Sequence, residues 1–178
     1  MEQSDFIVLL NKIPSEGLER EFEIANPAGA GIELSVPLEG PLHARFEIER
    51  LGGEIRVSGT VRAAVRLECS RCLAPFTLPV EGEVDAMFVP PSSAAEGEHQ
   101  YELSASELDV QPLVQGGADL RSLIAEQIHL ALPLKPLCRE SCVGICPHCG
   151  REVAAGPCGC APTAGDPRWE ALKKLTVP

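Results

Sequence analysis

Eight cysteines constrain what this chain can fold into more than any other feature. Two stand together in LECSRCLAPF, and six crowd the C-terminal part with the spacing C-x3-C-x3-C-x2-C-x8-C-x-C. Eight thiols divide into two sets of four, and four thiolates are the number that closes a tetrahedral structural zinc site. The residues concerned are Cys69, Cys72, Cys138, Cys142, Cys146, Cys149, Cys158 and Cys160.

The spacing favours one division of these thiols, because a C-x2-C loop aims two sulfurs at one point. We predict a first group of Cys69, Cys72, Cys138 and Cys142, and a second group of Cys146, Cys149, Cys158 and Cys160. The alternative joins Cys138, Cys142, Cys146 and Cys149, and leaves Cys69 and Cys72 to meet Cys158 and Cys160. Both groups offer four protein ligands and no open position. We therefore expect two structural zinc ions and no catalytic one.

Other sulfur chemistry fits the sequence less well. The spacing C-x3-C-x2-C from Cys142 to Cys149 is that of radical-SAM enzymes, but the chain lacks their repeated strand–helix alternation. Another iron–sulfur cluster remains an alternative, since a four-thiolate cage suits both metals. A redox role for Cys69 and Cys72 would need a helix after the pair, whereas Pro75 and a strand pattern follow.

The N-terminus predicts a cytoplasmic protein. Its apolar run from Phe6 to Leu10 has five residues and follows two acids, which suits neither a signal peptide nor a membrane span. Thiols stay reduced in the cytoplasm, so disulfides are disfavoured there and metal binding is favoured.

Three segments alternate apolar and polar residues with the period of a half-buried strand. They span residues 42–51, 54–69 and 76–88, and Gly52-Gly53 is the predicted hairpin turn between the first two. Weaker strand patterns cover residues 5–10 and 18–24, although the second could equally be a short helix. The pattern predicts an antiparallel meander with one solvated face.

One long helix is predicted over residues 116–132, with Asp119 as its cap and Pro133 as its stop. A last helix is predicted to begin after Asp166 and to bury Trp169. The expected fold class is α+β, with a mostly antiparallel sheet, one long helix and a C-terminal Cys-rich zinc-binding lobe. Residues 1–134 would form the sheet body with its covering helix, and residues 135–178 the lobe, tied to the Cys69–Cys72 turn.

Charge is unevenly spread along the chain. Residues 1–134 carry a net charge of −13 and residues 135–178 a net charge of +2. Phosphates repel an acidic surface, so the body suits a basic protein partner better than RNA. Arg56, Arg62 and Arg66 should pair with acids of neighbouring strands, the alternative being a stripe for RNA phosphates with Arg71 as its best member. The candidate RNA or partner contacts are Arg62, Arg66, Arg71, Lys135, Arg139, Lys173 and Lys174.

Four stretches together resemble one protein family. VRLECSRCLAPF, LALPLKPLCRESCVGICPHCG, CGC and DPRWEALKKL are similar to the motifs of the YceD family. The resemblance implies a role in accumulation of 23S ribosomal RNA, and hence in large-subunit assembly or rRNA processing, with no enzyme activity. It also places the family's motif positions on the eight cysteines and on Arg71.

Two functions follow as expectations. The first is a non-enzymatic factor in ribosome biogenesis, whose partner is the pre-ribosomal large subunit, 23S rRNA or a basic ribosomal protein. The alternative is a protein-binding adaptor or regulator of an RNA-processing enzyme. No membrane partner is expected, because the apolar run near the N-terminus is too short to span a membrane. No small-molecule substrate is expected, because the chain carries no P-loop, dinucleotide glycine motif or nucleophilic triad order.

Overall fold

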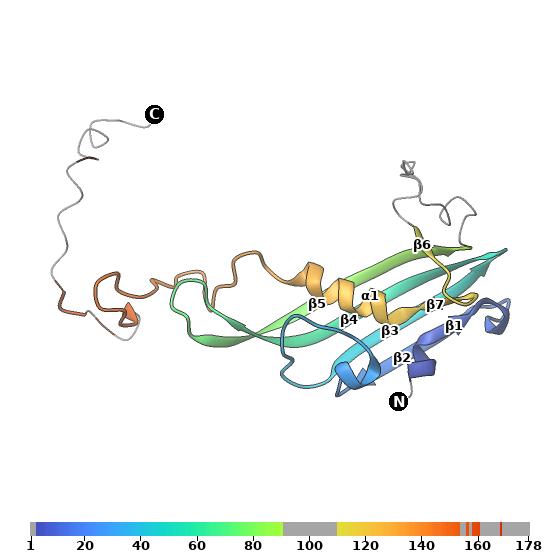
Figure 1. The fold of residues 1–178 in the computed structure, drawn as a ribbon, viewed down its shortest axis with the longest axis horizontal. Helices are drawn as coiled ribbons and strands as arrows, with labels where there is room; N and C mark the ends of the chain where they lie inside the picture. The colour runs from blue at the N-terminus through green and yellow to red at the C-terminus, as the bar shows by residue number, and fades with distance from the viewer. Residues whose placement is uncertain (1–2, 91–109, 154–155, 157, 161–167, 169–178) are drawn as a thin grey trace, which may run out of the picture.

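The period-2 alternation of the sequence becomes the main sheet of the protein. The computed structural model describes residues 3–90, 110–153, 156, 158–160 and 168. Four strands pair antiparallel in the order of the chain: β2 (Leu18–Ile24), β3 (Leu42–Leu51), β4 (Glu54–Glu68) and β5 (Pro75–Val89). Figure 1 shows them as one long curved sheet. This confirms the predicted meander.

Burial follows the predicted parity along the strands. On β3, Leu42, Ala44, Phe46 and Ile48 are buried and the residues between them are exposed. Gly59 interrupts the inward row of β4, and a Cβ atom there would lie 2.0 Å from the Arg45 carbonyl oxygen. No side chain fits that gap, so glycine at this point lets β3 and β4 approach closely where the sheet curves.

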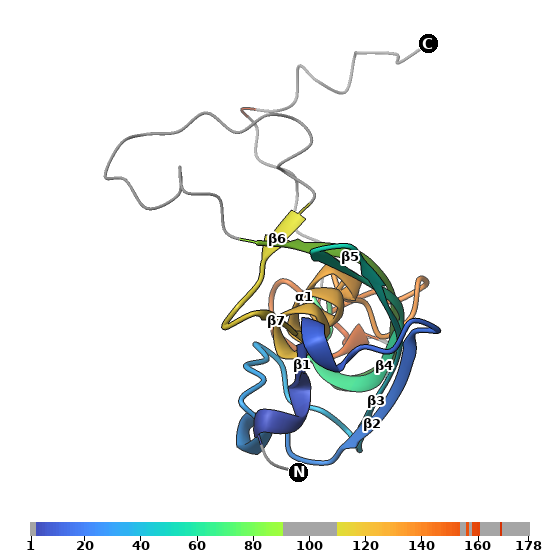
Figure 2. The ribbon, with the colours of Figure 1, turned by 90° about the vertical axis from the view of Figure 1, so that its right-hand side faces the viewer.

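Helix α1 (Leu120–Ala131) covers the inner face of the sheet, and the strands curl around it (Figure 2). Its buried stripe is Leu120, Leu123, Ile124 and Ile128, and it packs mainly on β5. A Cβ atom on Gly82 of β5 would lie 2.8 Å from the Cβ atom of Gln127. The glycine therefore sets how closely the helix approaches the sheet.

The helix begins later than the sequence pattern indicated. Asp119 caps it as predicted, accepting a hydrogen bond from the Arg121 N–H (3.0 Å). The residues just before it are not helical, because Gly117–Asp119 form β7, which pairs antiparallel with β1 (Ile7–Leu9). The prediction of helix from residue 116 was therefore wrong by four residues.

The N-terminal segment closes one end of the core. The predicted strand over residues 5–10 is reduced to β1, flanked by the 3-10 turns η1 (Gln3–Phe6) and η2 (Leu10–Lys12). Phe6 stacks on Phe22 of β2, with ring centroids 4.8 Å apart. A further 3-10 turn, η3 (Ala28–Ala30), lies in the connection from β2 to β3.

The sheet is mixed rather than purely antiparallel. β6 (Val110–Pro112) joins β5 in parallel, which the sequence pattern did not predict. The predicted helix after Asp166 lies outside the described residues except for Arg168. The α+β class with one helix and a mostly antiparallel sheet is confirmed.

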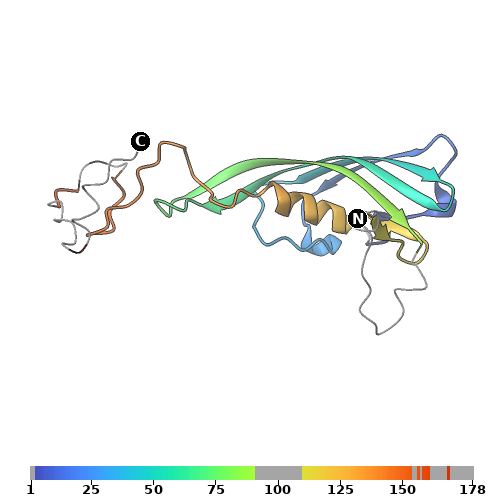
Figure 3. The ribbon, with the colours of Figure 1, turned by 90° about the horizontal axis from the view of Figure 1, so that it is seen from above.

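The cysteine-rich segment lies beyond one end of the sheet, next to the β4–β5 turn (Figures 1 and 3). In the part of the chain that the structure describes, no helix is both long and apolar enough to cross a bilayer.

Candidate metal centres

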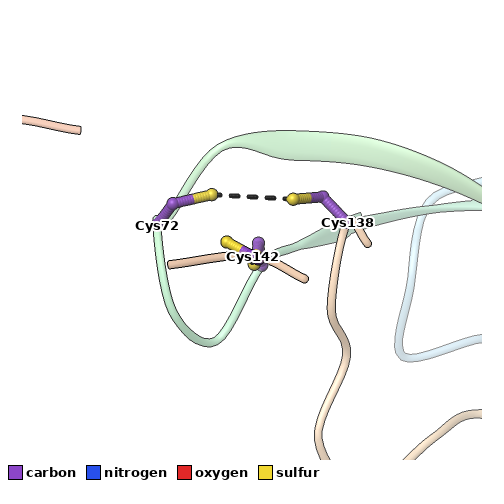
Figure 4. Close-up of side chains that lie close together, drawn as sticks. Cys72, Cys138 and Cys142 are labelled. Carbon is purple, nitrogen blue, oxygen red and sulfur yellow. Dashed lines mark hydrogen bonds between the residues drawn. The ribbon is translucent and has the colours of Figure 1, made fainter. Parts of the chain in front are cut away.

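The first cysteine group assembles at the β4–β5 turn. Cys69 follows the last residue of β4, Cys72 lies three residues on, and Cys138 and Cys142 come from the segment after α1. The Sγ atoms of Cys69 and Cys142 lie 3.8 Å apart, as do those of Cys72 and Cys138. Figure 4 shows the side chains of Cys72, Cys138 and Cys142 gathered at this turn. All four Sγ atoms lie within 4.8 Å of one another.

These distances fit a single tetrahedral ion. Four sulfurs at about 2.3 Å from a central zinc ion form a tetrahedron with edges of about 3.8 Å. A disulfide would bring two sulfurs to about 2.05 Å, and the eight cysteines are all free thiols. The first group could therefore hold a metal ion with little rearrangement.

The protein buries the first group in a small apolar cluster of its own. Cys69 and Cys142 are 0% and 2% exposed, and Phe76 and Leu137 pack against them. Burial of ionised sulfur is unfavourable unless a cation compensates the charge. The site is therefore built to hold thiolates only together with a positive ion.

Hydrogen bonds fasten the two contributing segments to each other. The Ser70 N–H donates to the Pro136 carbonyl oxygen (2.8 Å). The Arg71 guanidinium Nη1 donates to the carbonyl oxygens of Glu140 (3.2 Å) and Cys142 (2.7 Å). Arg71 thus clamps the loop that presents Cys142.

The second cysteine group is local in sequence. The Cys146 N–H donates to the Arg151 carbonyl oxygen (2.8 Å), and the Gly150 N–H donates back to the Cys146 carbonyl oxygen (2.9 Å). Gly150 has a φ of +71°, a conformation that suits glycine. The His148 N–H points at the Cys146 Sγ atom (3.4 Å). This tight turn brings Cys146 and Cys149 to one point, and Cys158 and Cys160 complete the group within 4.8 Å.

The thiols of each group differ in acidity. Hydrogen bonding by the Cys138 backbone lowers the pKa of Cys69 to about 6, while burial raises the pKa of Cys138 to about 12. In the second group, hydrogen bonding by the Cys149 and His148 backbones lowers the pKa of Cys146 to about 6. Hydrogen bonds with the neighbouring thiols of Cys149 and Cys158 raise the pKa of Cys160 to about 12. Four thiolates cannot coexist in either group without a cation to stabilise them.

The two groups also differ in exposure. In the first, Cys69, Cys72 and Cys142 are buried and Cys138 is half-buried. In the second, Cys146 is buried, whereas Cys149 and Cys160 are exposed. The structure thus assembles the two groups that the spacing favoured, and not the alternative division. That they bind a metal ion stays a prediction.

The candidate contact residues that the structure describes fall into two regions, the strands of the sheet and the surroundings of the first cysteine group. Arg56 pairs with Asp85 (3.1 Å) and Arg62 with Glu81 (2.7 Å), which confirms the predicted cross-strand pairing for these two. Arg66 instead pairs with Glu39 (3.1 Å), which lies in the connection before β3, so the predicted pairing with an acid of a neighbouring strand was wrong for Arg66.

The other candidate contacts lie around the cysteine groups or beyond the described residues. Arg71 is engaged at the first group, as described above. Lys135 and Arg139 are exposed near it. Lys173 and Lys174 lie outside the described residues. Contact of any of these residues with RNA stays a prediction.

Two polar contacts were not anticipated from the sequence. The carbonyl partners of Arg71 are backbone atoms about 70 residues away, which carry no signal in residue type. His129, near the end of α1, accepts a hydrogen bond at Nε2 from the Ser35 N–H (3.1 Å), fastening the β2–β3 connection to the helix.

The fold and its cysteine groups define a class: a small curved-sheet protein with two four-thiol groups at one end. Residues 57–176 match the family model described as "Large ribosomal RNA subunit accumulation protein YceD". The chain belongs to the YceD family.

Among similar proteins are uncharacterized proteins of Mycobacterium tuberculosis and Mycobacterium bovis. Each is 32% identical over 173 residues, which cover 97% of this chain and 80% of the relative. A maize protein named "Large ribosomal RNA subunit accumulation protein YCED homolog 1, chloroplastic" is 26% identical over 144 residues, covering 68% of this chain and 49% of the maize protein. No solved structure matches the chain significantly.

Proposed function

We propose that this chain is a non-enzymatic assembly factor of the cytoplasm that supports accumulation of large-subunit (23S) ribosomal RNA, with two structural zinc ions. Membership of the YceD family supports the rRNA role. The observation that supports structural ions and a non-enzymatic role is the arrangement of eight free thiols in two complete groups of four. Complete four-thiol sites leave no position for water or substrate, so such ions stabilise structure.

Zinc suits both groups better than a cluster. The 3.8 Å separations in the first group match the edge of a tetrahedron around one ion. An iron–sulfur cluster places several metal atoms between its ligands, and so needs its cysteine sulfurs further apart. When bound, the ion would neutralise the thiolates and cross-link the segments that carry them. Cys69, Cys72, Cys138 and Cys142 would hold one ion, and Cys146, Cys149, Cys158 and Cys160 the other.

The activity would then be carried by surfaces. The sheet body (residues 1–134) and the lobe (residues 135–178) act in this proposal as two units joined by the first group. Lys135 and Arg139 of the lobe are exposed and available to phosphates. Arg62 and Arg66 are already paired with carboxylates, so RNA would have to compete for them.

The test is genetic and analytical together. A strain that lacks its own family member is complemented with this chain, and the ratio of large-subunit to small-subunit rRNA is measured by electrophoresis. Metal content is measured by mass spectrometry on the purified protein. We expect two zinc ions per chain, one in Cys142→Ser, and a restored rRNA ratio only with the unchanged chain or with the control Ser70→Ala. A metal-free chain that restores the rRNA ratio in full would refute the proposal. Iron bound in place of zinc would refute the part of the proposal that assigns zinc to the two groups.

A further inference from the structure

The outer face of the sheet is left uncovered by the fold. Helix α1 packs on the inner face, and in Figure 2 no described element lies over the outer face of β3 and β4. The residues that point outward are exposed charged and polar side chains along β2 to β5.

Register places two rows of acids along this face. Glu19, Glu21 and Glu23 line β2 on one side, and Glu81, Glu83 and Asp85 line β5 on the other. Three strand spacings separate the rows, which is about 14 Å. Between them, β3 contributes Glu47 and Glu49.

The outward arginines between the rows do not neutralise them. Arg45 pairs with both Glu19 and Glu21 (3.3 Å each), Arg56 with Asp85 and Arg62 with Glu81. Glu54, Glu68 and Arg66 also point outward from β4, so ten carboxylates face four guanidinium groups, a net charge of −6. Across the described residues, the outward acids that form no ion pair are Glu23, Glu47, Glu49, Glu54, Glu68 and Glu83.

One pairing on this face disfavours folding. Glu19 lies directly opposite Glu47 in the register of β2 and β3. Like charges at directly opposite positions destabilise a sheet. A partner that brings positive charge to this point would relieve the repulsion.

The face is hollowed beside the short outward side chains of Thr60 and Ala64 on β4. A depression of about 390 Å³ is lined by His43, Thr60, the arginines Arg45 and Arg62, which are paired with acids of the two rows, and the acids Glu21 and Glu23. A second depression of about 570 Å³ adjoins it, shares His43 and Arg62, and has Ala64 and Pro79 in its wall. Together they form a trough between the two acid rows.

We propose that this outer face binds a basic segment of a protein, lying in the trough with its lysines and arginines directed to the acid rows. A helix is about 10–12 Å across, and an extended strand is narrower, so either fits between rows about 14 Å apart. RNA does not fit the same surface, because the net charge of −6 repels phosphates. The inference rests on the proposed function only in taking the basic segment to belong to an assembly partner.

The test uses the full chain, loaded with zinc, and a labelled synthetic peptide of alternating lysine and alanine. Binding is measured by fluorescence anisotropy at about 150 mM salt, where long-range attraction is screened. A face variant replaces Glu23, Glu47, Glu49 and Glu83 by Gln. A matched control replaces the exposed acids Glu16, Glu33, Glu140 and Glu152 by Gln, which changes the net charge equally.

We expect the face variant to weaken binding about tenfold, or ~1.4 kcal/mol, and the control to remain within about twofold. Equal weakening in both variants would overturn the inference, since only total charge would then matter. Absence of peptide binding by the unchanged chain would overturn it too, as would direct binding of a labelled single-stranded RNA oligonucleotide that the face variant alters and the control does not. The assay is independent of the rRNA ratio, so a chain that binds the peptide but does not restore that ratio refutes the proposed function alone.

Discussion

Replacement of Arg71 by alanine should loosen the metal ion at the first cysteine group. Arg71 carries no thiol, but its guanidinium donates to the carbonyl oxygens of Glu140 and Cys142. Without those two bonds, the loop that presents Cys142 is held to the β4–β5 turn mainly by the Ser70–Pro136 backbone bond and the apolar cluster. The group should then open more often and release its ion faster.

The size of the effect follows from the two bonds. Charged hydrogen bonds contribute ~1.5–3 kcal/mol each when buried, and less where solvent competes, so about 1–3 kcal/mol together is expected at this partly exposed position. That free energy corresponds to an increase of about 5- to 150-fold in metal dissociation from the first group. Metal at the second group should be unaffected, because Arg71 does not contact it.

The assay is metal release to a colorimetric chelator, followed over time. Arg139→Ala is the matched control, since it removes an exposed arginine from the same segment without breaking a side-chain hydrogen bond that the structure records. Arg71→Lys should be intermediate, because an ammonium group does not reproduce the fork of a guanidinium. If Arg71→Ala releases both ions at the unchanged rates, the clamp does not support the site. Arg71 would then be free to serve as the RNA contact that its position first suggested.

Three further outcomes are expected. A chelator should remove metal from the second group first, in a fast phase of release, because Cys149 and Cys160 are exposed. Cys149→Ser should abolish this fast phase. A single phase of release from the unchanged chain would contradict the prediction. Gly82→Ala should lower the free energy of unfolding, measured in urea, by ~1–3 kcal/mol, because the added Cβ atom would overlap α1. An unchanged midpoint of urea unfolding would show that the helix can shift to make room. Burial would raise the pKa of Asp119, but hydrogen bonds from Arg121 outweigh burial, and the pKa is lowered. The ionised Asp119 therefore stabilises the folded protein above about pH 3.9, and this stabilisation is lost as the pH falls through the lowered pKa. Asp119→Asn should therefore be less stable than the unchanged chain at neutral pH and equally stable in strong acid, as measured by thermal unfolding.

The sequence predicted the main strands because their alternation is local. The spans of β2 and β3 agree with the predicted limits, and those of β4 and β5 agree to within one residue. The sequence also predicted the N-cap of α1, since aspartate before an apolar helical stripe is a signal within one turn. What the pattern did not predict depends on distant partners. β7 has three residues and exists through pairing with β1, more than 100 residues earlier.

The cysteine groups were predictable for a related reason. Short spacing brings Cys146 to Cys149 by turn geometry alone, and the count of eight then left few divisions. The surroundings of the first group were not predictable from residue type. The partners of Arg71 are main-chain carbonyls, and the partner of Arg66 is Glu39 in a connection with no periodic pattern.

The first cysteine group has a consequence for biosynthesis. Its ligands come from both sides of the α1 segment, so the hairpin tip bearing Cys72 leaves the translating ribosome 70 residues ahead of Cys142. At about 5–20 residues per second, the early pair of thiols waits roughly 4–14 s for the late pair to emerge. Under the proposed metal binding, the second group would need only its own short stretch of nascent chain, whereas the first could close only after the body and its helix have been made.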